Sequence, residues 1–194
     1  MRLQVVTAPT RYPVTISEAV AQLRIDANDD DMVIAGYLAT ATKLVEEWSG
    51  TSMMQRTYKL FLDAWPVMLG VIPRALPLQM PPLVSVTHIK TYNDSDVATV
   101  WSAASYFVDT ANGRIGLRSG ASWPIPDRLT NGIEIQFVAG YESAGDTPEN
   151  LRHAILLTVA HWHRNREPVN IGNITSTLPF GVTDLIGLSR EWRF

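Results

Sequence analysis

The chain has 194 residues, of which 46% are hydrophobic and 18% are charged, as expected for one or two globular domains with a sizeable buried core. The formal net charge of −3 provides no basic excess for wrapping nucleic acid, and the absence of cysteine excludes disulfide frameworks, cysteine-based zinc sites and thiol nucleophiles. No apolar run approaches the ~20 residues that a membrane-spanning helix requires, and the N-terminal segment lacks the apolar region of a signal peptide. The sequence therefore predicts a protein that is used in the cytosol or assembled from it.

Hydrophobic periodicity and capping signals predict three helices. Thr15 or Ser17 can cap the first helix, and Gly50 provides a C-terminal stop for the second. Asp146 or Thr147 can cap the third. The second helix carries apolar residues at spacings of three and four, which predicts a single buried stripe. This stripe consists of Ile34, Tyr37, Leu38, Ala41, Leu44, Val45 and Trp48. The three predicted helices cover about residues 17–25, 29–49 and 147–166.

The segment between the second and third helices is predicted to be β-rich. It contains several prolines, which exclude long helices, and short runs of alternating β-branched and aromatic residues. These runs are "TYKLFLDAW", "VSVTHIKTY", "SYFVDT", "GRIGLR" and "GIEIQFVAGY". We therefore predict an α+β fold, in which a helical bundle carries a small inserted antiparallel sheet at about 57–140 and a C-terminal tail. Residues 1–50 and 146–194 would form the helical core with its tail, and residues 51–145 the inserted β-rich region.

The segment "LRHAILLTVAHWHRNREP" suggests a metal-binding helix at first sight. His153 and His161 would lie about 12 Å apart along the helix axis at ~1.5 Å per residue, too far apart to share one ion. His161 and His163 point in nearly opposite directions, and only His163 and Glu167 are spaced at i, i+4. A zinc site would also need His88 from the β region. The sequence therefore predicts no metal site here, and Leu151, Ile155, Thr158 and Trp162 are predicted to form a core face.

The segment "DANDDDM" at residues 26–32 resembles the start of a calcium-binding loop. Asp26, Asn28 and Asp30 would take the first three ligand positions. Asp31 then stands where a glycine is required, and Tyr37 stands where a bidentate glutamate is required. The favoured interpretation is an acidic N-terminus of the second helix, where the helix dipole stabilises carboxylates.

Other catalytic or ligand-binding signals are weak. We find no Gly-x-Ser-x-Gly elbow, Walker loop, dinucleotide fingerprint or His-Glu-x-x-His pattern. The serines of "RSGAS" at residues 118–122 are interpreted as loop serines, and Glu46 and Glu47 as residues on a solvated helix face. Trp48 and Trp162 are assigned to core stripes, and Trp65, Trp101 and Trp123 to packing among strands and turns. We therefore predict no enzymatic activity and no cofactor.

Five segments, in this order, carry a resemblance to a known family. They are "VTISEAVAQLRID", "DDDMVIAGYLATATKLVEEWSG", "SYFVDTANGRIGLRSGASWP", "IEIQFVAGYESAGDTPENLRHAILLTVAHWHRNRE" and "LPFGVTDLIGLSREWRF". Together they resemble the head–tail connector, or adaptor, proteins of tailed bacteriophages and phage-derived gene transfer agents, in particular the longer members with a β insertion. The resemblance spans roughly residues 13–192, and residues 1–12 and 169–178 lie outside its clear part.

This resemblance implies a structural virion protein at the neck, assembled in the cytoplasm of a bacterial host. Twelve subunits would form a ring beneath the portal protein, extend the DNA channel without sequence-specific binding, and present a surface to a stopper, head-closure or tail protein. The helices would make the lateral contacts, and the C-terminal tail would dock on the portal. The residues proposed for this docking are Arg190, Glu191, Trp192, Arg193 and Phe194. Alternatively, Trp192 and Phe194 fold back onto the chain's own core.

Two other functions remain open at the level of sequence. The first is a small ligand- or glycan-binding module, with Trp101 or Trp123 in the β insertion as stacking platforms. The second is an enzyme that uses His161, His163 and Glu167. The tail type, and the choice between an infectious phage and a gene transfer agent, also stay open.

Overall fold

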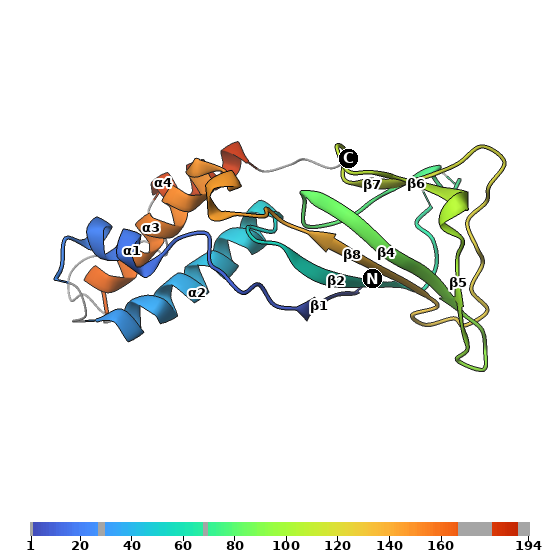
Figure 1. Cartoon of the computed structure of the whole chain (residues 1–194), viewed down its shortest axis with the longest axis horizontal. Coiled ribbons are helices and arrows are strands. Elements are labelled where there is room, and N and C mark those ends of the chain that lie inside the picture. The colour runs from blue at the N-terminus through green and yellow to red at the C-terminus, as the bar shows by residue number, and fades with distance from the viewer. Residues whose placement is uncertain (1, 27–29, 68–69, 167–179, 190–194) are drawn as a thin grey trace. The chain divides into compact units, whose positions relative to one another are not determined.

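A computed structural model of the chain describes residues 2–26, 30–67, 70–166 and 180–189. The chain divides into two compact units (Figure 1). A β unit contains residues 1–9 and 55–140, and a helical unit contains residues 10–54 and 141–194. The predicted α+β class is confirmed, because four helices and two antiparallel sheets make up the described part of the chain.

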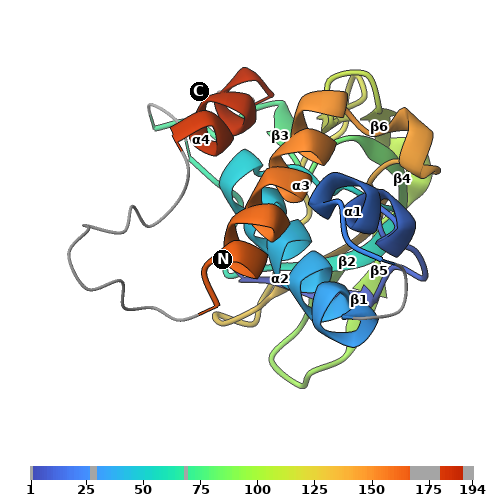
Figure 2. The same cartoon turned by 90° about the vertical axis from the view of Figure 1, so that its left-hand side faces the viewer.

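The helical unit is built around α2 and α3, with α1 and α4 packed on both of them. Figure 2 shows α3 lying between α1 and α4. The helices are α1 (Ile16–Leu23), α2 (Asp31–Ser49), α3 (Glu149–Arg164) and α4 (Phe180–Leu188), with a short 3-10 turn at Ala144–Asp146. The core is aliphatic and includes Ile34, Leu38, Val45, Leu151, Ile155 and Ile186.

Local sequence signals explain the start of α1 and the end of α2. Thr15 caps α1 through a capping box, because its hydroxyl accepts the Glu18 N–H at 3.2 Å and the Glu18 carboxylate accepts the Thr15 N–H at 2.7 Å. Gly50 ends α2 in the left-handed conformation, with φ of 69°. The predicted caps of α3 were wrong. Pro148 precedes its first residue without a side-chain cap, and Asp146 instead closes the preceding 3-10 turn with Ser143.

The burial of two α2 residues also differs from the prediction. Trp48, assigned to the core stripe, is 46% exposed. Glu46, assigned to a solvated face together with Glu47, is only 4% exposed, and its carboxylate accepts the Met53 N–H at 2.8 Å. The backbone after Gly50 returns over this face of the helix, so Glu46 meets a backbone donor. Helical periodicity alone cannot predict such a return of the chain.

The β unit contains two sheets where the sequence predicted one. A five-stranded antiparallel sheet has the order β1-β2-β8-β4-β5, and a three-stranded sheet has the order β3-β7-β6. The first consists of β1 (Arg2–Thr7), β2 (Arg56–Leu62), β8 (Ile133–Ala139), β4 (Leu83–Tyr92) and β5 (Ala98–Val100). The second consists of β3 (Ala75–Pro77), β7 (Arg114–Leu117) and β6 (Tyr106–Asp109).

Strands β1, β3 and β5 carry no clear sequence signal. β1 is exposed along nearly its whole length and lacks the alternation of a half-buried strand, and β3 and β5 have three residues each. β1 instead depends on its antiparallel pairing with β2, in which Leu3 lies opposite Leu60.

The core of the β unit follows from alternation along β2 and β8. Tyr58 and Leu60 on β2 lie opposite Phe137 and Ile135 on β8, and all four side chains are buried. The Tyr58 and Phe137 rings stack with centroids 5.5 Å apart. The opposite face of the same strands carries Lys59 and Glu134, whose arrangement is described below.

Candidate interaction sites

A surface pocket of about 370 Å³ lies in the helical unit. The segment before α1 contributes Arg11 and Tyr12, α1 contributes Ile16, and α2 contributes Ala35 and Leu38. Most of the lining is apolar, and Arg11 is its one charged member. Chemically, the pocket suits an apolar side chain, and Arg11 would favour an acidic group beside that side chain.

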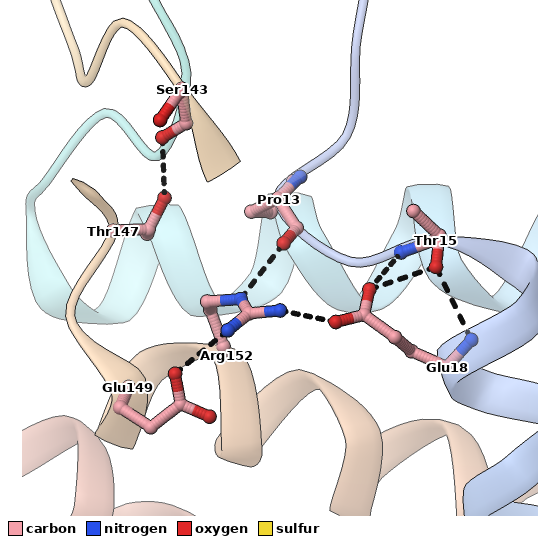
Figure 3. A network of polar contacts seen from close by, with 7 residues as sticks. All are labelled: Pro13, Thr15, Glu18, Ser143, Thr147, Glu149 and Arg152. Carbon is pink, nitrogen blue, oxygen red and sulfur yellow. Dashed lines mark hydrogen bonds and ion pairs between the residues drawn. The ribbon is translucent and has the colours of Figure 1, made fainter. Parts of the chain in front are cut away.

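A polar network anchors the segment that forms one wall of this pocket (Figure 3). Arg152 on α3 donates from Nε to the Pro13 carbonyl at 3.0 Å and pairs with the Glu149 carboxylate at 2.7 Å. Its guanidinium also pairs with the Glu18 carboxylate. Figure 3 shows Arg152 reaching between Glu149 on α3 and Glu18 on α1, with Pro13 beside it. One α3 side chain thus holds both the chain before α1 and α1 itself.

The electrostatics of this network favour the ionised form of Glu18. The hydrogen bond from the Thr15 backbone N–H is the largest effect that lowers the pKa of the carboxyl group, and the Thr15 hydroxyl and Arg152 lower it further. Partial burial acts in the opposite direction but does not outweigh these contacts. Glu18 therefore stays charged at neutral pH and caps α1 while it pairs with Arg152. Neither Glu18 nor Arg152 was among the site residues predicted from the sequence, because their pairing joins residues 134 positions apart.

The histidines of α3 do not converge. His163 Nε2 lies 3.1 Å from Asp30 Oδ2 and 2.9 Å from Arg166 Nη2, and His161 Nδ1 faces the Asn165 amide at 3.4 Å. His153 is exposed. In residues 2–26, 30–67, 70–166 and 180–189, no group of three or more His, Cys, Asp or Glu side chains is placed to hold a metal ion. Glu167 lies outside the described residues.

Asp30 takes part in an ion cluster at the start of α2. It is the N-cap residue, but its carboxylate pairs with Arg166 and His163 and makes no capping hydrogen bond. The hydrogen bond from Arg166 is the main cause of its lowered pKa, followed by that from His163. Asp30 and Asp31 do stand at the start of α2, but Asp30 is held by these two partners and not by helix-end N–H groups. Residues 27–29 of the calcium-like segment lie outside the described residues.

The tryptophans of the β unit form an internal stack. The Trp65 and Trp123 rings lie 4.3 Å apart, and Trp101 lies 5.4 Å from Trp123. Trp65 donates its indole N–H to the Pro124 carbonyl at 2.6 Å, and Trp123 donates to the Pro73 carbonyl at 2.9 Å. Trp65 and Trp123 are buried, so these two rings pack the core and offer no open stacking face to a glycan. Trp101, the other predicted platform, is partly exposed, and its ring stacks on Tyr106 with centroids 5.2 Å apart. This geometry gives no support to the glycan-binding alternative.

Glu134 on β8 is a buried carboxylate that the sequence analysis missed. Its Oε1 lies 2.9 Å from His88 Nε2 and 3.1 Å from Lys59 Nζ, and its Oε2 accepts the Tyr92 hydroxyl at 2.9 Å. Burial acts to raise the pKa of this carboxyl group, but the hydrogen bonds from His88, Tyr92 and Lys59 outweigh burial and hold the pKa below its ordinary value. Burial also raises the pKa of the Tyr92 phenol, followed by its bond to Glu134. Its contacts with His88, Lys59 and Tyr92 stabilise the buried charge of Glu134, which is consistent with a structural role for this carboxylate.

Arg190, Glu191, Trp192, Arg193 and Phe194, predicted to dock on a portal, lie outside the described residues. The segment at 118–122 follows β7 as a turn with Gly120 at φ of 77°, and its two serines are exposed. No helix in the described parts of the chain is both long and apolar enough to span a membrane.

Comparison with known proteins identifies a consistent group of similar structures. No family model and no curated protein sequence matches the chain. A chain in the neck of an empty gene transfer agent (GTA) particle, computed with C6 symmetry, is 27% identical, with a TM-score of 0.78. A chain in the virion of a native GTA particle is 26% identical, with a TM-score of 0.78, and one in the neck of a native GTA particle computed with C12 symmetry is 26% identical, with a TM-score of 0.72.

Each of these three matches covers 100% of this chain and 97% of the other chain. The likeness therefore includes the helical unit and the β unit alike. The chain is similar, over its whole length, to chains of the neck and virion of gene transfer agent particles.

Proposed function

We propose that this chain is a structural subunit of the neck of a phage-like particle, in the role of a head-to-tail adaptor. Twelve copies would form a ring beneath the portal, extend the DNA channel and join the head to a stopper or tail protein. The particle would assemble in the cytoplasm of its bacterial host. The observation that carries the proposal is the whole-length similarity to chains of GTA necks, at 26–27% identity and TM-scores of 0.72–0.78.

The symmetry of those necks supports the ring. Chains similar to this one occur in necks computed with C6 and C12 symmetry, and cyclic assemblies require a contact between two different patches of the same subunit. In this proposal the helical unit is the connector core and the β unit is an inserted contact region. Residues 190–194 dock on the portal, because large aromatic side chains and arginine are common anchors at protein interfaces.

The sites described above are consistent with a structural role. Glu134, Asp30 and Arg152 are each engaged by several partners within their own unit, which suits ion pairs that fix a scaffold. The net charge of −3 disfavours tight binding of DNA that passes through the channel, because such binding requires clustered Lys and Arg.

Electron microscopy of the full chain bound to the portal protein encoded in the same genome tests this proposal. We expect twelvefold rings on the portal and the presence of the chain in purified particles. A chain that is absent from particles and leaves the portal undecorated at saturating concentration would contradict the proposed function.

A truncated variant tests the docking of residues 190–194 separately. Removal of residues 190–194 is expected to weaken portal binding by at least about tenfold, as is typical for the loss of an aromatic anchor. The matched control is Leu188→Ser, which changes an exposed apolar residue just before this segment. Equal portal affinity of the truncated and full chains would show that the tail is not the anchor.

A further inference from the structure

Two apolar side chains stand out on the surface of the β unit. Ile125 is 85% exposed and Leu129 is 89% exposed, and both lie in the loop between β7 and β8. The turn between β4 and β5 lies beside part of this loop, because Asp96 in the turn pairs with Arg128 in the loop. We call residues 93–97 and 125–132 together the tip. Figure 1 shows its two parts as the connection between β4 and β5 and the chain that leads into β8.

The backbone of the tip is held at several points. The N–H groups of Asp127 and Arg128 both donate to the Tyr92 carbonyl at 3.2 Å, and the Tyr92 N–H donates to the Gly132 carbonyl at 2.9 Å. The Asn131 N–H donates to the Asp63 carboxylate at 2.7 Å. These bonds fasten the loop to the end of β4 on one side and to the residue after β2 on the other. The loop is therefore fixed to the sheet where β4 and β2 end.

Arg128, a residue of the loop, connects the loop to the end of β4 and to the turn between β4 and β5. Its guanidinium lies 4.2 Å from the centroid of the Tyr92 ring, pairs with Asp96 at 3.0 Å, and donates to the Asn131 carbonyl. Gly132 permits a close approach, because a Cβ there would lie 2.7 Å from the Pro126 Cβ and would also collide with the Arg128 carbonyl. The loop thus has a defined conformation that keeps Ile125 and Leu129 in solvent.

The exposure of Ile125 and Leu129 lowers the stability of the isolated chain relative to a state in which these side chains are buried. Burial of an isoleucine or leucine side chain stabilises a fold, and the isolated chain does not gain this stabilisation at these two positions. Apolar side chains on a pre-organised loop lose little conformational freedom on binding, which favours affinity. The two observations together indicate a docking surface for a protein.

The charges of the tip narrow the kind of partner. The charged side chains of these segments and of the residue that fastens them are Asp63, Asp94, Asp96, Asp127 and Arg128. The exposed charged groups of these segments are thus mainly carboxylates, and Arg128 is already paired with Asp96. Phosphate groups of nucleic acid would be repelled here. The tip of a second copy of this chain carries the same negative charge and would also be repelled. In addition, the equivalent patches of two copies do not meet in a ring.

We propose that the tip inserts Ile125 and Leu129 into an apolar pocket with a Lys/Arg rim on a different protein of the particle. This proposal rests on the proposed function, since it assumes that the chain is part of a particle. It assigns a partner surface to the β unit, in addition to the docking role proposed for residues 190–194.

Photo-crosslinking in assembled particles tests the identity of the partner. The full chain carries p-benzoylphenylalanine in place of Leu129, with the same replacement of Phe107 as control, because Phe107 is 52% exposed on the other sheet. We expect the Leu129 position to cross-link to another virion protein, at a peptide in which Lys or Arg flanks apolar residues. Cross-links only to further copies of this chain, or none at Leu129, would overturn the proposal.

Binding measurements with the purified partner provide a second readout. The double variant Ile125→Ser, Leu129→Ser is expected to bind at least about tenfold more weakly, with unchanged melting temperature. Binding of the unmodified chain should also weaken as salt is raised, because the acidic rim faces a basic one. Unchanged affinity of the double variant would overturn the proposal. Incorporation of the unmodified chain is scored in parallel, and its absence from particles would overturn the proposed function as well.

Discussion

Glu46 in the helical unit and Glu134 in the β unit are both buried, with 4% and 3% of their surface exposed, but they are stabilised in different ways. Glu46 accepts the N–H of Met53, seven positions away, where the chain returns after α2. Glu134 is held by His88 and Tyr92, which lie 46 and 42 positions away, and by Lys59 on a third strand. One buried carboxylate thus accepts from nearby backbone, and the other from side chains on the two neighbouring strands, β2 and β4.

This contrast reflects how the two units are built. The helical unit forms its elements from local hydrogen bonds, so a buried acid can be satisfied by the next stretch of chain. The β unit pairs strands that are distant in sequence, such as β2 with β8, and the partners of Glu134 come together only when the sheet has formed. The partners of Glu134 therefore depend on the assembled sheet, whereas the Met53 N–H reaches Glu46 through a local return of the chain.

The largest effect is expected from Glu134→Ala. Loss of this carboxylate leaves the Lys59 ammonium and the donors of His88 and Tyr92 without their buried acceptor. The free energy of unfolding should fall by about 3 kcal/mol, as when one member of a buried ion pair is removed. Urea denaturation measures the loss, and hydrogen exchange should locate it in β2, β4 and β8. The control, Glu134→Gln, keeps one acceptor oxygen and should cost less.

A smaller effect is expected from Glu46→Ala. The buried Met53 N–H loses its carboxylate acceptor, which should lower the free energy of unfolding by about 2 kcal/mol. Glu47→Ala is the matched control, because Glu47 is the exposed neighbour and its removal should change stability by no more than about 0.5 kcal/mol. Equal effects of the two variants would show that the difference in burial has no energetic meaning.

The next effect is expected at the start of α1. Thr15→Ala removes the side-chain acceptor of the Glu18 N–H and should lower the free energy of unfolding by about 1 kcal/mol. Ser17→Ala tests the alternative cap suggested by the sequence and should have little effect, because Ser17 lies within α1. A larger loss from Ser17→Ala than from Thr15→Ala would contradict the observed capping box.

The smallest effect concerns the dependence of stability on pH. The pKa of Glu134 is lower in the folded chain than its ordinary value of 4.5, so unfolding takes up a proton at acidic pH. Its stabilising contribution is fully present above pH 4.5 and is lost as the pH falls below that value towards the folded pKa. In Glu134→Gln, stability should fall less steeply across this acidic range. An unchanged pH profile in that variant would refute the assigned ionisation.

Much of the helical unit could be predicted from local patterns. The spacing of Ile34, Leu38, Ala41 and Val45 correctly predicted the buried face of α2, and Thr15 was among the predicted caps. Runs of alternating β-branched and aromatic residues likewise predicted β2, β4 and β8, although only β2 shows a regular period-two burial and β8 is buried on both faces over Ile133–Ile135. Each of these signals belongs to a short stretch of chain and to the regular geometry of one element.

The features missed by the sequence analysis depend on which segments meet in space. β1 is a strand because it pairs with β2, and Arg152 is a key residue because Pro13 and Glu18 lie beside it. The sequence by itself determined the α+β class and the main helices and strands, because helical and strand periodicities are local. The tertiary structure alone decided the strand order, the burial of Glu46 and Glu134 and the exposure of Ile125 and Leu129, because these depend on contacts between distant parts of the chain.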